Sequence, residues 1–229
     1  MVFNLHKNLF NKNSSATPSY PFFVEAILKE QLMPQERESR YVLPLEKALM
    51  AKGFGSISGG GSTLFDRAEP GEREILESCI DIELANLDEA LDLTKQTLNE
   101  LGAPVGSKLN YSKNDTACSE PIGDNELLNV YFDNYNLAPE IYEKVDTRTL
   151  YEALTTALKG KIVGTPNGPY TWPSEVLFYF IGPSADQIYE QIEPLRFEFP
   201  IFQNARVVFK KKDTQTAQTE IRIPFNARE

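Results

Sequence analysis

The sequence predicts an α+β protein built from two tandem ferredoxin-like units. Each unit would have the order β-α-β-β-α-β, with both helices on one face of an antiparallel sheet. Three observations lead to this prediction. Segments with the two-residue period of strands alternate with segments of helical period, and the same order occurs twice. A polar stretch with Pro and Gly, residues 112–126, separates the two occurrences.

Four helices are predicted from apolar residues at helical spacing and from residues that cap helix ends. The helix at 86–101 has the clearest pattern, and Leu91 and Leu98 belong to the apolar stripe that we expect to be buried. In the second half, Asp146 and Ser184 stand at the N-cap positions of two helices. The predicted helices are 45–52, 86–101, 147–159 and 184–195.

Strands are predicted from apolar or alternating runs bounded by turn residues. The glycines at 59–61 interrupt the second run and are interpreted as a bulge or flexible turn. A phosphate-binding loop would need a following Lys-Ser/Thr pair and a helix, which this run lacks. The predicted strands are 22–32, 54–58 with a continuation at 62–65, 75–84, 108–112, 127–132, 161–164, 175–181 and 205–210, with an edge strand within 219–225.

The predicted organisation is a polar N-terminal tail at 1–20, a first unit at 21–116, a second at 117–212 and a C-terminal tail at 213–229. The first 20 residues lack the apolar core and cleavage site of a secretory signal, and no apolar run approaches the ~20 residues of a membrane helix. Two cysteines, Cys79 and Cys118, are expected to be free thiols. A cytoplasmic location is therefore expected.

Composition argues against several functional classes. The chain has 229 residues with a formal charge of −10, from 33 acidic and 23 basic residues, which disfavours nucleic acid as a partner. With one His, in the N-terminal tail, and two Cys, zinc clusters, Cys-x-x-Cys redox sites and His-based triads are excluded. The basic run at 210–212 is interpreted as a solvated strand end. We therefore expect no catalytic residues, no cofactor and no metal, and a protein that is not an enzyme.

Negative charge is concentrated in and beside the predicted strand 75–84. Residues 66–100 contain eleven acidic and three basic residues. Because strand side chains alternate, Glu77, Asp81 and Glu83 would share the face opposite the helices. Together with Glu72 and Glu74, they are predicted to form an acidic face that binds a basic protein partner.

Two other interpretations of these carboxylates remain open. The charges can form a solvated face, or Glu77, Asp81 and Glu83 can share a hard cation such as Mg²⁺ or Ca²⁺. Nothing in the segment resembles an EF-hand loop, and no His supports a transition metal.

The strand at 175–181 is apolar on both faces, so its second face must be covered. We expect the other unit or a tail to cover it. Tyr170 and Trp172, in the connection before this strand, are predicted to bind a partner. Their alternative role is to seal the end of the core.

Several segments resemble a group of small, acidic, uncharacterised bacterial proteins. The residues that carry the resemblance are the Gly-Gly-Gly-Ser turn, the Asp-Ile-Glu strand, the Gly-Ala-Pro after the helix and the Gly-Pro-Ser-Ala-Asp helix entry. These proteins are similar to immunity proteins that neutralise bacterial toxins. The resemblance implies a fold and a toxin domain as the basic partner, and it implies no catalytic residue.

Two functions are consistent with these observations. The first is an immunity protein that neutralises a toxin through its acidic surface. The alternative is a small-molecule-sensing regulatory protein with its ligand between the two units. The oligomeric state is left open.

Overall fold

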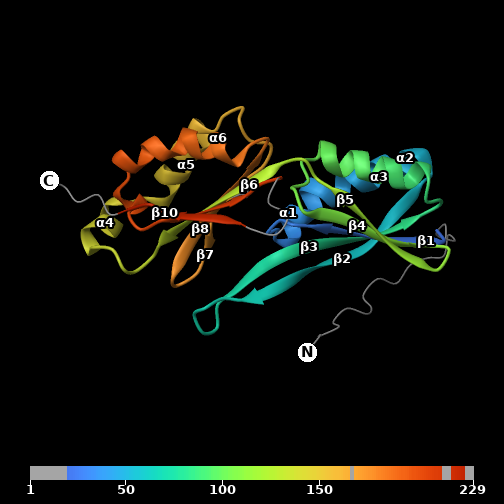
Figure 1. Cartoon of the computed structure of the whole chain (residues 1–229), viewed down its shortest axis with the longest axis horizontal. Helices are drawn as coiled ribbons and strands as arrows, with labels where there is room; N and C mark the ends of the chain where they lie inside the picture. The colour runs from blue at the N-terminus through green and yellow to red at the C-terminus, as the bar shows by residue number, and fades with distance from the viewer. Residues whose placement is uncertain (1–19, 166–167, 213–217, 225–229) are drawn as a thin grey trace.

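The computed structural model describes residues 20–165, 168–212 and 218–224. Two antiparallel five-stranded sheets lie beside each other along the longest axis of the molecule, and helices cover one face of each (Figure 1). The predicted α+β class is confirmed. The predicted N-terminal tail up to residue 19, residues 213–217 and the end of the predicted edge strand at 225 lie outside the described residues.

The first sheet has the strand order β2-β3-β1-β4-β5. Leu91 and Leu98 of α3 pack with Ile80 and Ile82 of β3, and all four side chains are buried as the helical stripe predicts. The elements of this half are β1 (Phe22–Leu28), α1 (Pro34–Arg37), a π-helical turn (Glu38–Val42), α2 (Leu43–Lys52), β2 (Gly55–Asp66), β3 (Arg73–Leu84), α3 (Glu89–Glu100), β4 (Ser107–Lys113) and β5 (Thr116–Ile122).

The second sheet has the order β10-β9-β6-β8-β7, and α5 and α6 cover one of its faces. Asp146 accepts hydrogen bonds from two backbone N–H groups of α5, and Ser184 accepts one from α6, so both predicted N-caps are confirmed. The elements are β6 (Glu126–Asp133), α4 (Pro139–Lys144), α5 (Thr147–Ala157), β7 (Tyr170–Thr171), β8 (Glu175–Gly182), α6 (Ala185–Ile192), two 3₁₀ turns (Glu193–Phe197 and Pro200–Phe202), β9 (Arg206–Lys210) and β10 (Thr219–Arg222).

The polar stretch at 112–126, predicted as the divide between the units, forms a hairpin of the first sheet. Asn114 and Asp115 have φ of 51° and 58°, the left-handed conformation that a two-residue hairpin turn requires. This turn returns the chain as β5, which pairs with β4 along its whole length. The predicted boundary between residues 116 and 117 therefore falls inside a strand, and the chain crosses to the second sheet after β5.

Other predictions change in part. The predicted strand 22–32 ends at Leu28, and the segment before the predicted helix 45–52 contains α1 and the π-helical turn. Residues 161–164 form only an isolated bridge, between Gly164 and Ile181, instead of a strand. The glycines at 59–61 lie within one continuous strand, β2, and the predicted bulge lies directly before them, at the register shift between Ile57 and Gly59. A Cβ on Gly60 would lie 2.5 Å from the carbonyl oxygen of Cys79, so the close approach of β3 requires glycine.

The β2–β3 hairpin extends beyond the first sheet and reaches the second half of the molecule (Figure 1). The pairing of its two strands shifts register a second time, between Thr63 and Leu64. The hairpin thereby brings the Arg67 segment beside the helix-free face of the second sheet. Among the described helices, none has the length and apolar character needed to cross a membrane.

Candidate ligand site between the two sheets

The segment that follows β1 places a buried carboxylate where the two halves meet. Glu30 is fully buried, forms an ion pair with Arg40 and accepts hydrogen bonds from Tyr41 (2.7 Å) and Tyr179 (3.2 Å). Burial raises the pKa of the Glu30 carboxyl, while the Arg40 guanidinium and the two tyrosine hydroxyls oppose that rise. Because Tyr179 lies on β8, this cluster joins the first half to the second sheet.

The local backbone explains why Arg40 and Tyr41 reach the same carboxylate. Both belong to the π-helical turn Glu38–Val42, a widened turn that is common at functional sites. The Arg40 side chain lies against Gly164, where a Cβ would collide with the guanidinium. Its Nη2 atom is buried and has no hydrogen-bond partner among the described residues.

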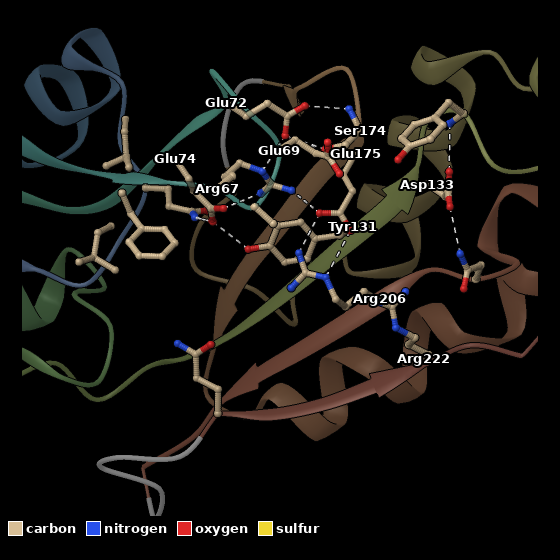
Figure 2. A pocket seen from close by; sticks show the side chains of 18 of the residues that line it. Arg67, Glu69, Glu72, Glu74, Tyr131, Asp133, Ser174, Glu175, Arg206 and Arg222 are labelled. Carbon is tan, nitrogen blue, oxygen red and sulfur yellow. Dashed lines mark hydrogen bonds and ion pairs between the residues drawn. The ribbon is translucent and has the colours of Figure 1, made fainter.

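Arg67, in the loop of the β2–β3 hairpin, holds the hairpin against the second sheet (Figure 2). It forms ion pairs with Glu72 (3.1 Å), Glu74 (2.6 Å) and Glu175. Its guanidinium carbon also lies 4.2 Å from the centre of the Trp172 ring. Since Glu175 belongs to β8, the ion pairs link elements more than 100 residues apart.

Arg206 and Tyr131 continue this network on the second sheet. The Arg206 guanidinium lies 3.8 Å from the centre of the Tyr131 ring and 2.8 Å from a carboxylate oxygen of Glu175. The Tyr131 hydroxyl donates a hydrogen bond of 2.9 Å to Glu74. Burial, and then the negative charge of Glu74, raise the pKa of Tyr131, so its hydroxyl stays protonated and available as a donor.

A cavity of about 550 Å³ lies between the hairpin and the second sheet, and Figure 2 shows its walls. Arg67 and Leu76 contribute from the first half, and Tyr131, Asp133 and Arg206 contribute from the second. Burial would raise the pKa of Asp133, but hydrogen bonds from Asn136 and its neighbours outweigh burial and lower it. The cavity therefore presents fixed charges of both signs.

A second cavity, of about 670 Å³, lies where the end of β9 approaches the first sheet. Leu76 and Lys210 line both cavities. These two cavities are adjacent in the seam between the two sheets, and residues of both halves line each of them.

The predicted acidic face divides into two parts. Glu77, Asp81 and Glu83 lie on the face of the first sheet opposite its helices, as their alternation predicts. Glu77, however, forms an ion pair with Lys29.

Glu72 and Glu74 do not belong to this face, and their assignment to it is corrected. Both pair with Arg67, and Glu72 also accepts hydrogen bonds from the backbone and hydroxyl of Ser174. The extended hairpin carries these two carboxylates to the seam, where the second half binds them.

Asp81 lies beside a second carboxylate that sequence reasoning did not assign to the acidic face. Glu25 of β1 is its cross-strand neighbour. Burial, and then repulsion by Glu25, raise the pKa of Asp81 above its usual value, while Arg37 opposes the rise. Like charges at this position are costly unless another group compensates them.

The alternative interpretation, a cation shared by Glu77, Asp81 and Glu83, involves other residues than those that the structure brings together. Possible ligand atoms of Glu25, Cys79 and Asp81 lie within 4.8 Å of one another, whereas Glu77 pairs with Lys29. Burial raises the pKa of the Cys79 thiol, so the thiolate that would bind a metal is disfavoured. Cys79 and Cys118 are both free thiols, as predicted.

Tyr170 and Trp172 lie in the seam, where they cover the helix-free face of the second sheet. The Tyr170 hydroxyl is 2.6 Å from the carbonyl oxygen of Gln31, and the Trp172 indole N–H donates to the carbonyl oxygen of Arg73 at 2.7 Å. These contacts support the alternative role, since both aromatic residues seal an internal junction. The expectation that the other unit covers strand 175–181 is confirmed by the contacts of Tyr179 with Glu30 and Gln31.

Sequence reasoning missed the charged residues that organise the seam. No motif marks them, and three of them have partners on other elements: Glu30 with Tyr179, Arg67 with Glu175 and Arg206 with Glu175. The fourth, Arg40, pairs with Glu30. One usable signal was Glu30 itself, a carboxylate directly after an apolar strand. A second was Arg67, one of only three basic residues in the acidic segment.

A scan against protein-family models finds no match, and a search of curated proteins finds none either. Among solved structures, an unknown protein from Galdieria sulphuraria matches at 14% identity and a TM-score of 0.23, over 82% of this chain and 96% of that one. A "putative monooxygenase" from Lactobacillus acidophilus NCFM matches at 13% identity and a TM-score of 0.26, over 90% of this chain and 100% of that one.

The expectation that this chain is not an enzyme is contradicted by the second of these structures, whose name is that of an enzyme, and it is withdrawn. A likeness at this TM-score assigns no reaction, substrate or catalytic residue to the chain.

Proposed function

We propose that the protein is a ligand-binding protein made of two tandem ferredoxin-like units, with its ligand in the seam between them. The strand orders β2-β3-β1-β4 and β7-β8-β6-β9 support the two units, because both place the first strand of a half at the centre and its second strand at an edge. The observation that carries the ligand site is the cavity of about 550 Å³ whose walls come from both halves. Its volume is within the roughly 300–1,000 Å³ of small-molecule sites.

The charged lining supports a regulatory role for such a ligand. The ion pairs from Arg67 and Arg206 to Glu175 connect the hairpin with β8 and β9. A ligand that contacted either guanidinium would alter the junction between the halves. Ligand binding would thereby be coupled to their relative placement.

Thermal unfolding in the presence of a metabolite panel tests this proposal. A ligand at 100 times its dissociation constant stabilises the folded state by about 2.7 kcal/mol. For a chain of this length, that corresponds to a rise in Tm of roughly 5–10 °C. A substitution at Leu76 tests the location of the ligand, because this side chain lines both cavities and is 46% exposed.

Leu76→Trp should fill the seam and abolish the stabilisation by a ligand. Met50→Trp is the matched control, because Met50 is 64% exposed on α2 and away from the seam. Stabilisation that survives Leu76→Trp unchanged would place the ligand elsewhere and contradict the proposal.

We also propose a second candidate function, binding of a basic protein, with a toxin domain as the partner that the resemblance suggests. The specific observation is that Glu25, Asp81 and Glu83 form no ion pair within the described part of the chain. A basic partner would compensate these charges. A cytoplasmic location is part of this proposal, and the two free thiols support it.

Charge reversal tests the second candidate. Changing Glu25, Asp81 and Glu83 together to Lys should slow association with a co-purified basic partner and reduce its salt dependence, because the steering charges are removed. Reversal of Glu46, Glu89 and Glu100, which lie on the helix side, is the control for net charge. Equal loss in both triple variants would contradict a specific acidic face.

A further inference from the structure

The cavity of about 670 Å³ is unusual in a protein of formal charge −10, because five lysines line it. They come from both halves of the chain. The first half supplies two and the second half supplies three: Lys29, Lys108, Lys210, Lys211 and Lys212. Among the described residues that line this cavity, none is acidic.

Three of these lysines are compensated from outside the cavity. Lys29 pairs with Glu77, Lys211 with Asp186 (2.6 Å) and Lys212 with Asp124 (3.8 Å). The Asp186 and Asp124 side chains are 57% and 80% exposed, so solvent weakens both of these pairs.

Lys108 and Lys210 differ from the other three. Neither side chain forms an ion pair or a hydrogen bond with any part of the chain that the structure describes. Lys210 is half-buried, and burial lowers its pKa, while the negative charges of Glu74 and Glu30 oppose the shift without an ion pair. The Lys210 ammonium has therefore lost part of its hydration without gaining a direct partner.

We infer that this lysine-lined cavity binds a small polyanion, a molecule with two or more phosphate or carboxylate groups. Two unpaired ammonium groups require a ligand of at least two negative charges for compensation. Lysine binds phosphate and carboxylate as a point charge, and the cavity volume is that of a small-molecule site. The inference rests on the proposed seam function and assigns a ligand chemistry to the second of the two cavities in the seam.

The structure also explains why the basic run at 210–212 could not be recognised as a site from the sequence. Three lysines in a row indicate only a solvated strand end. The site exists because Lys29, directly after β1, and Lys108 of β4 line the same cavity as this run.

Isothermal titration calorimetry at low ionic strength tests the inference, with inorganic tripolyphosphate and citrate as separate probes. The wild-type protein should bind at least one of them saturably and with one-to-one stoichiometry. Preference for tripolyphosphate assigns a phosphate ligand, and preference for citrate assigns a polycarboxylate. Both outcomes support the inference.

The double variant Lys108→Gln with Lys210→Gln should weaken binding at least tenfold. Its matched control is Lys47→Gln with Lys52→Gln, which removes the same charge from the exposed side of α2. The control should retain affinity within twofold. Absence of saturable binding of either probe, or equal weakening in both double variants, would falsify the inference.

Stability measurements exclude misfolding as the cause of lost binding. Lys210→Met should melt at or above the wild-type temperature in the absence of ligand, because it removes a desolvated, unpaired charge. A lower melting temperature would mean that Lys210 is internally compensated and would contradict the inference. A different outcome would overturn this inference and retain the proposed function. In that outcome neither polyanion binds, but an uncharged or cationic metabolite stabilises the protein, and Leu76→Trp abolishes this stabilisation.

Discussion

The helix-free faces of the two sheets differ in chemistry, although the strand orders of the sheets correspond. In the first sheet this face presents Glu25, Asp81 and Glu83, which are half-buried and form no ion pair within the described ranges. In the second sheet it presents Leu177 and Tyr179, which are at most 1% exposed. One topology therefore serves two purposes: a charged surface in one half and a junction in the other.

The difference follows from the strands themselves. β3 alternates between apolar and charged residues, which suits a sheet with one face in water. β8 is apolar on both sides and requires a cover, which the aromatic pair Tyr170 and Trp172 and the segment around Glu30 provide.

Glu30→Ala should give the largest loss of stability, about 3–5 kcal/mol, because it leaves the Arg40 guanidinium in the junction without its carboxylate. Chemical denaturation measures this loss. The double variant Glu30→Met with Arg40→Met should recover much of it, since an apolar pair can replace a buried ion pair. A loss below about 1 kcal/mol for Glu30→Ala would mean that the junction tolerates an unpaired charge. This result would contradict the view that the helix-free face of the second sheet is tightly covered.

Leu98→Ala tests the helix-covered face of the first sheet. This face is apolar in both sheets, so the contrast between the sheets should not extend to it. The side chain is 0% exposed, and its truncation should cost about 2–5 kcal/mol. Leu98→Met, which conserves volume, should cost less than about 1.5 kcal/mol and serves as the control. Equal costs for the two variants would show that the site responds to shape more than to burial.

Asp81→Asn should stabilise the protein modestly at pH 7, by about 0–1 kcal/mol, since the group is partly exposed. Burial and Glu25 raise the pKa of Asp81 in the folded state above its unfolded value. Between these two values the folded state binds more protons, so stability falls as pH rises, and the ionised group destabilises above that window. The advantage of the variant should vanish at pH values below the ordinary pKa of aspartate, which urea denaturation across pH can measure.

Glu25→Gln provides a check on this pH effect. Glu25→Gln should reproduce part of the gain in the free energy of unfolding that Asp81→Asn gives. The double variant should gain less than the sum of the two single variants, because both changes relieve the same repulsion. Strict additivity would indicate that the two carboxylates do not interact.

Glu83→Lys should have the smallest effect, within about 0.5 kcal/mol, because the side chain forms no ion pair among the residues described. Thermal unfolding at low and high salt measures it. A larger loss would show that the helix-free face of the first sheet is also engaged, and the contrast between the two faces would weaken.

Much of the secondary structure could be predicted because its causes are local. Helical spacing located the four long helices of the described residues, and side-chain caps marked the starts of two of them, at Asp146 and Ser184. The hairpin at Asn114–Asp115 was missed because the polar composition of the segment was interpreted as a linker, although two residues that tolerate positive φ were a turn signal. The domain boundary was displaced for the same reason.

The alternation of β3 and the apolar character of both faces of β8 follow directly from the residue pattern, and so does the need for a cover on the second sheet. Which residues form that cover, and which charges remain unpaired, depends on the packing of the two halves. Arg67 and Glu175 are separated by 108 positions and Glu30 and Tyr179 by 149, and no local period reports such pairs. Their meeting depends on the reach of one hairpin and on the packing of two sheets. The same packing separates Glu72 and Glu74 from the acidic face and places Lys108 and Lys210 in the lining of one cavity.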